Sequence, residues 1–84
     1  MPAKPTPSSV SIARAHIGAN IRRLRKAMDL TQEKLGEIAG YHRTYVSQLE
    51  RCRTNISVDR LDRLAQILGV DAHTLMQPPP DEEG

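Results

Sequence analysis

Aromatic residues are almost absent from this chain of 84 residues, which has no Trp, no Phe and only Tyr41 and Tyr45. A core must then be built from Leu, Ile, Val and Ala, a composition that suits helices better than a sheet. A single Cys excludes an internal disulfide. The chain also lacks an apolar run of about 18 residues and a signal-peptide pattern, so we expect no membrane contact and a cytoplasmic location.

Groupings of residues that bind metals or catalyse reactions are also missing. His16, His42 and His73 fall in different segments, without an i, i+4 or CxxC spacing. There is neither a nucleophile elbow nor a Gly-rich loop that could hold a phosphate. The sequence therefore predicts no enzyme activity, no metal site and no cofactor.

Positive charge is unevenly placed along the chain. Residues 11–68 contain eleven Arg or Lys against six Asp or Glu, a balance of +5, whereas residues 70–84 contain four acids and no base. A basic folded part with an acidic tail indicates a polyanionic partner. An ordinary solvated surface would give the same counts, and from charge alone it is the simpler reading.

Apolar residues are spaced for five helices, and the sequence has no internal repeat. In residues 11–28 one stripe runs along a helix of four to five turns, formed by Ile17, Ile21, Leu24 and Met28. Ser57 can cap a fourth helix and Gly69 can end it. Asp71 can cap a short fifth helix over residues 72–76, with Leu75 facing inward. The inward stripe of the fourth helix consists of Leu61, Leu64, Ala65 and Leu68.

These elements divide the chain into three parts. Residues 1–10 contain three Pro and no apolar periodicity, which predicts a flexible arm, whose Lys4 is an alternative DNA contact. Residues 11–77 form the one folded domain, which is small enough for oligomerisation to add needed stability. Pro78 to Pro80 forbid a longer fifth helix, and residues 78–84 are expected to be a disordered acidic tail.

The stretch Thr31 to Arg51, TQEKLGEIAGYHRTYVSQLER, reads as two short helices and a tight turn. Thr31 can cap the first helix, and Gly40 supplies the left-handed conformation that the turn requires. Small Gly36, one turn earlier, leaves room for the helices to cross closely. We expect Leu35, Ile38 and Ala39 to form one apolar face and Val46 and Leu49 to form a second.

This stretch resembles the DNA-binding helix-turn-helix of the Cro and phage-repressor proteins, often called the XRE family. The match rests on Gly36, Gly40 and Val46 and on apolar residues at Leu35, Ala39, Tyr41 and Leu49. The resemblance covers residues 17–76, and RTYVSQLER followed by RTNIS is most similar to the controller proteins of restriction–modification systems. It implies a compact, all-α, five-helix domain of the lambda-repressor type. It also implies a transcriptional regulator that binds double-stranded DNA.

In such a domain the second helix of the motif enters the major groove and its N-terminal residues read base edges. Arg can donate two hydrogen bonds to guanine, Gln can pair with adenine, and Thr can contact thymine through its methyl group. Without the resemblance the same residues would be only the polar face of an amphipathic helix. The predicted base-reading residues are Arg43, Thr44, Ser47 and Gln48.

Contacts to phosphates should flank that helix, because they fix register without reading sequence. Gln32 matches the family's backbone-contacting glutamine, and the loop beyond the reading helix carries further candidates. The hydroxyl of Tyr45 is another candidate, although packing of its ring explains this residue equally well. The predicted phosphate contacts are Gln32, Tyr45, Arg51, Arg53 and Asn55.

The resemblance also implies a structural ion pair between Arg25 and Glu50. Cys52 departs from the family, which usually has Gly there in a left-handed conformation. A non-Gly residue tolerates that conformation at a cost of about 1 kcal/mol. Filling of a loop position explains this Cys more simply than a redox role does.

The family's usual dimer contact is the fifth helix with the end of the fourth. We therefore expect a homodimer on a near-palindromic operator, since two-fold pairing presents two reading helices about one DNA turn apart. An antitoxin or adaptor that uses the same fold to bind a protein partner is the alternative. The predicted interface residues are Ile67, Val70, His73, Thr74 and Met76.

Overall fold

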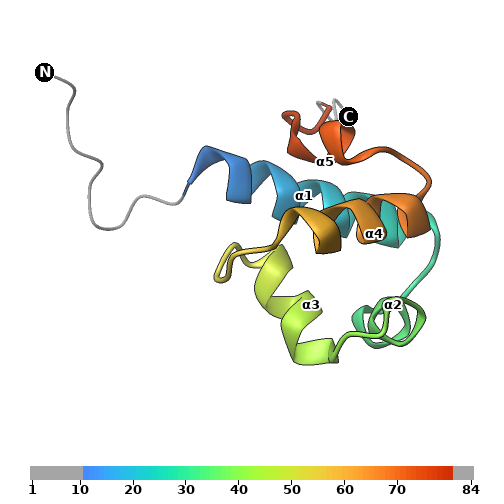
Figure 1. The fold of residues 1–84 in the computed structure, drawn as a ribbon. Coiled ribbons are helices and arrows are strands. Elements are labelled where there is room, and N and C mark those ends of the chain that lie inside the picture. Colours follow the sequence, from blue (N-terminus) through green and yellow to red (C-terminus); the bar gives the residue numbers. More distant parts are fainter. Residues whose placement is uncertain (1–10, 81–84) are drawn as a thin grey trace, which may run out of the picture.

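The computed structural model describes residues 11–80, and this range folds into five helices without a strand. They are α1 (Ile12–Ala27), α2 (Gln32–Ala39), α3 (Arg43–Glu50), α4 (Val58–Leu68) and α5 (Ala72–Met76). In Figure 1, α1 and α4 cross the middle of the molecule, with α5 on one side of them and α2 and α3 on the other. The predicted all-α, five-helix fold is confirmed. The predicted N-terminal arm and the tail beyond Pro80 lie outside the described residues.

Local hydrogen bonds explain where the helices begin and end. The backbone N–H groups of Lys34, Arg60 and Thr74 donate to the side chains of the predicted caps. Each such bond satisfies one of the unpaired N–H groups of a first helical turn. Gly40 and Gly69 end α2 and α4 with φ of 82° and 81°, the left-handed conformation that Gly adopts without strain. The predicted caps are Thr31, Ser57 and Asp71.

Asp71 is held as a carboxylate by its capping bonds. The backbone N–H and then the hydroxyl of Thr74 donate to it, both at 2.8 Å, and they lower its pKa. Hydrogen bonds to the charged form favour ionisation, so the cap of α5 depends on pH.

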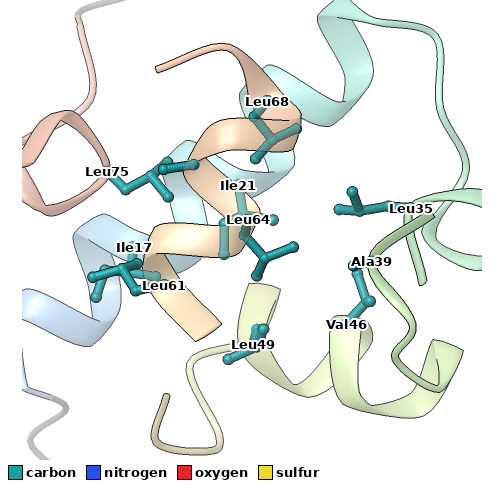
Figure 2. Packing of buried hydrophobic residues seen from close by; sticks show 11 residues of the cluster. Ile17, Ile21, Leu35, Ala39, Val46, Leu49, Leu61, Leu64, Leu68 and Leu75 are labelled. Carbon is teal, nitrogen blue, oxygen red and sulfur yellow. The ribbon is translucent and has the colours of Figure 1, made fainter. Parts of the chain in front are cut away.

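One core joins all five helices, as Figure 2 shows. Every helix has a fully buried apolar side chain in this core; in the order of the helices these are Ile21, Leu35, Val46, Leu64 and Leu75. None of the described helices is long and apolar enough to cross a membrane.

Two residues expected in the core are instead exposed. Ile38 is 45% exposed because the buried side of α2 is formed by Leu35, Gly36 and Ala39, which leaves Ile38 to one side. Met28 is 47% exposed because α1 ends at Ala27. Asp29 follows with a φ of 62°, which turns the chain away from the helix axis. Both predictions of inward packing were wrong.

Candidate nucleic-acid interface

The turn between α2 and α3 depends on two glycines. The N–H groups of Gly40 and Tyr41 both donate to the carbonyl oxygen of Gly36 at 2.8 Å, which closes the end of α2. A Cβ atom added to Gly36 would lie 2.5 Å from the carbonyl oxygen of Tyr41. Any side chain at Gly36 would therefore push the turn away from α2. The turn of this chain therefore depends on Gly at this position.

Helix α3 presents its polar side to solvent. Val46 and Leu49 point into the core, while His42 precedes the helix and its Nδ1 accepts a hydrogen bond from the N–H of Thr44 at 3.1 Å. Of the four predicted base-reading residues, Arg43, Thr44 and Gln48 are exposed and Ser47 is half-buried. Within residues 11–80 none of these four side chains hydrogen-bonds another protein group. Their donors and acceptors are available to a ligand.

The predicted phosphate contacts differ in their exposure and in their hydrogen bonds to the rest of the protein. Arg51 and Arg53 are exposed just after α3. Nη2 of Arg14 in α1 donates to Oδ1 of Asn55, so this amide is held against the start of α1. Gln32 is half-buried, and its Nε2 donates to Oε1 of Glu50 at 3.1 Å. The hydroxyl of Tyr45 is buried, a position that does not suit a contact with a phosphate.

Arg25 and Glu50 form a two-pronged ion pair between α1 and the end of α3. Nε and Nη2 of Arg25 donate to the two carboxylate oxygens at 2.6 and 2.9 Å, and Nη1 donates to the carbonyl oxygen of Leu30 at 2.8 Å. The two side chains are 10% and 2% exposed. The hydrogen bond to Glu50 raises the pKa of Arg25. With Gln32 bound to the same carboxylate, the pair ties α1, α2 and α3 together.

Cys52 lies where the chain leaves α3, with a φ of 59°. The left-handed conformation predicted for this position is confirmed. The residue is half-buried, and a Cβ added to Gly18 of α1 would lie 3.1 Å from its Sγ and 2.6 Å from the carbonyl oxygen of Leu49. Helix α1 therefore passes this end of α3 at a distance that only Gly permits. Sequence reasoning missed Gly18, although a Gly inside a helix is itself a signal of close packing.

Helix α5 is anchored to α1 by a buried polar residue that sequence reasoning also missed. Asn20 is 1% exposed, and its Nδ2 donates to the carbonyl oxygens of Leu75 at 2.9 Å and of Gln77 at 2.7 Å. One turn earlier, Nδ1 of His16 donates to the carbonyl oxygen of Met76 at 3.2 Å. These bonds satisfy carbonyls at the end of a helix only five residues long. The one available signal was an Asn beside the apolar stripe of α1.

The predicted dimer residues lie at the end of α4, in α5 and in the turn between these helices. Met76 is 44% exposed and His73 is exposed. Ile67, Val70 and Thr74 are half-buried, and the hydroxyl of Thr74 donates to Asp71. Among them, the apolar side chains of Ile67, Val70 and Met76 are only partly covered by the rest of the domain.

Comparison with known proteins identifies a family for most of the described chain. Residues 21–75 match the family described as Helix-turn-helix, HTH_3. A hypothetical transcription factor from Neisseria meningitidis serogroup B is 41% identical over 66 residues, which cover 79% of this chain and 62% of that relative. The crystal structure of the Neisseria factor NHTF has a TM-score of 0.77 at 38% identity, covering 94% of this chain and 88% of that chain.

Two further similarities concern regulators of named systems. The restriction–modification controller protein C.AhdI from Aeromonas hydrophila has a TM-score of 0.69 at 34% identity, covering 74% of this chain and 94% of that chain. The biofilm regulator SinR in complex with DNA has a TM-score of 0.67 at 35% identity, covering 73% of this chain and 98% of that chain. SinR from Bacillus subtilis is 36% identical over 61 residues, which cover 71% of this chain and 55% of that relative.

The helix-turn-helix geometry, the family match and the similarity to controller proteins agree with one another, and the predicted resemblance is confirmed. The chain belongs to the HTH_3 family, and it is a transcriptional regulator with a helix-turn-helix DNA-binding fold.

Proposed function

We propose that the protein regulates transcription by binding a near-palindromic DNA operator as a homodimer, with α3 of each subunit in the major groove. The observation that carries this proposal is the polar side of α3. Arg43, Thr44 and Gln48 are exposed at its start and middle, while Val46 and Leu49 fix the opposite side in the core. A rigid helix with free donors and acceptors at one end is suited to reading base edges. SinR, a relative of similar fold, was solved in complex with DNA.

Each base-reading side chain has a role that follows from its chemistry. Arg43, the first residue of α3, donates two hydrogen bonds to the O6 and N7 atoms of a guanine. Gln48 donates to and accepts from an adenine through its amide. Thr44 and Ser47 offer hydroxyl groups, and the methyl group of Thr44 also suits a thymine. These residues determine which operator is preferred.

Phosphate contacts on both sides of α3 set its register on the duplex. The N-terminus of α2 presents backbone N–H groups beside Gln32, a favourable place for a phosphate. Arg51 and Arg53 add charge in the loop after α3, and Asn55 lies in the same loop. We leave Tyr45 out of this set because its hydroxyl is buried.

The homodimer is proposed to form through the side of the molecule that carries α5. Ile67, Val70 and Met76 are partly uncovered there, and a second copy would remove them from water. Thr74 and His73 border these apolar residues. The hydrogen bonds from Asn20 of α1 hold the end of α5 in position, so the proposed interface is already ordered in the single subunit. Two-fold pairing then places two reading helices about 34 Å apart, one turn of DNA.

Selection of bound sequences from a random DNA pool tests this proposal. We expect one preferred half-site, repeated with two-fold symmetry and centred about one helical turn apart. Sedimentation of the protein on the selected duplex should give two subunits per site. Recovery of random sequences, with binding that falls steeply with salt for every duplex, would refute sequence-specific recognition and favour the protein-binding alternative.

A further inference from the structure

An arginine of α4 lies over the two tyrosines beside the turn of the motif. The guanidinium carbon of Arg60 is 5.5 Å from the ring centre of Tyr41 and 5.1 Å from that of Tyr45. The rings themselves meet edge to face, with centres 5.4 Å apart and planes at 80°. Both separations from the cation are within the range of about 6 Å at which the face of an aromatic ring attracts it. Tyr41 belongs to the turn, and Tyr45 to the first helical turn of α3.

A second arginine on the same side of α4 contacts the other end of the turn. Nε of Arg63 donates to the carbonyl oxygen of Ala39 at 2.8 Å. Ala39 is the last residue of α2, so this bond satisfies a carbonyl that the helix leaves unpaired. Helix α4 therefore contacts the end of α2, the turn and the start of α3.

The residue preferences of a first helical turn do not explain an arginine at position 60 of α4. Ser57 caps the helix, and Arg60 is the third residue after this cap. The positive end of the helix dipole disfavours a cation there, and Glu or Gln would complete a capping box. Asp59 is the residue in this turn that suits the dipole. The contact with the rings of Tyr41 and Tyr45 explains why an arginine stands at this position.

We propose that Arg60 is a positioning residue for DNA reading, which acts through Tyr41 and Tyr45 to hold the N-terminal turn of α3. Tyr45 follows the base-reading residues Arg43 and Thr44 directly in the chain. Holding its ring therefore limits the directions in which these two side chains leave the backbone. Recognition residues must be held to within about 0.5 Å of their working geometry, which requires such a supporting layer. This inference rests on the proposed reading of bases by α3.

The composition of the chain provides a direct probe of this contact. Tyr41 and Tyr45 are the only aromatic residues in the sequence, so near-ultraviolet circular dichroism reports on this cluster alone. Arg60→Ala should change the tyrosine signal while leaving far-ultraviolet helicity intact. Lys26→Ala is the matched control. It removes the same charge from an exposed position of α1 and should leave the signal unchanged.

The functional test compares the selected operator with random DNA over a series of salt concentrations. Arg60→Ala should lower the preference for the operator about tenfold, the scale of one disturbed base contact. Binding to random DNA and its salt dependence should remain those of the parent protein. Arg60→Lys should recover part of the preference, because a lysine also attracts a ring but cannot stack as a plane. Lys26→Ala should keep the full preference.

Several outcomes would overturn the inference. A salt slope reduced by about 0.9 with the preference intact would make Arg60 a phosphate contact. Equal losses for operator and random DNA, together with a smaller folded fraction, would make its role purely structural. An unchanged tyrosine signal would show that the contact does not exist in solution. A parent protein without any preferred sequence would refute the proposed function itself, and the positioning role with it, whatever the tyrosine signal shows.

Discussion

Removing one member of the Arg25–Glu50 pair should be among the most damaging single changes in this domain. In Arg25→Met the carboxylate of Glu50, in a side chain only 2% exposed, loses both of its bonds from the guanidinium. The carbonyl oxygen of Leu30 loses its partner as well. A buried charge left without its partner costs about 3–5 kcal/mol. A domain this small should lie near the low end of the usual range of about 5–15 kcal/mol, so we expect the variant to be partly unfolded near 37 °C.

Urea denaturation of a set of variants measures this effect and separates its causes. The double variant Arg25→Met with Glu50→Leu leaves no buried charge, and it should recover all but about 1 kcal/mol of the loss. Lys34→Met is the control, because it breaks the exposed Lys34–Glu37 pair, whose side chains are 58% and 61% exposed with a separation of 3.4 Å. That change should cost no more than about 0.5 kcal/mol.

The reasoning fails if Arg25→Met costs under about 1 kcal/mol, the usual worth of an exposed pair. It also fails if the double variant is as unstable as the single one. The loss would then come from altered packing of α1 against α3, since removal of the stranded charge would bring no recovery.

Five further substitutions test other parts of the structure. Arg43→Ala should cost about 1–3 kcal/mol on the selected operator and relax the preference at one base pair per half-site, whereas Arg53→Ala should weaken all duplexes equally and reduce the salt slope by about one. Met76→Glu should give a folded monomer by sedimentation with much weaker operator binding, and a variant that stays dimeric would place the interface elsewhere. Cys52→Gly should raise stability in thermal denaturation by about 0.5–1 kcal/mol without changing the operator, because Gly adopts the left-handed conformation freely; a lower melting temperature would mean that packing of the thiol outweighs this strain. Asp71→Asn should be less stable than the parent protein at neutral pH, since folding lowers the pKa of Asp71 from its ordinary 3.8. This difference in stability should be present above pH 3.8 and should disappear as the pH falls through the lowered pKa of the folded state. A difference that does not depend on pH would contradict the stabilising role of the Asp71 carboxylate.

Features that depend on neighbours in the chain could be predicted from the sequence. The caps at Thr31, Ser57 and Asp71 bond N–H groups three residues ahead, so the residue type and its place before an apolar stripe suffice. The left-handed conformations at Gly40 and Cys52 follow from the length of the turn and from the family pattern. The identity of the motif follows as well, because its small and apolar residues recur at set spacings.

The tertiary structure alone decided which helix faces meet. Leu35 and Ala39 are buried and Ile38 is exposed, yet all three are apolar residues of one short helix. The hydroxyl of Tyr45 was a candidate for a phosphate contact until the packing around it showed that it is buried. The rotation of a helix about its own axis is set by the elements that pack against it. Hydrophobic spacing defines only a wide apolar face, so it does not decide which residues at the edge of that face are buried.

Contacts between distant residues were equally beyond reach from the sequence. Asn20 donates to carbonyl oxygens 55 and 57 residues away, and Arg63 donates to one 24 residues away. An Asn or an Arg in a helix has the same local preferences whether or not such a partner exists, so no pattern marks these bonds. The sequence by itself determined the five helices, the caps of three of them and the helix-turn-helix motif. Packing of those helices decided which polar groups support the motif, because burial brings together donors and acceptors that are far apart in the chain.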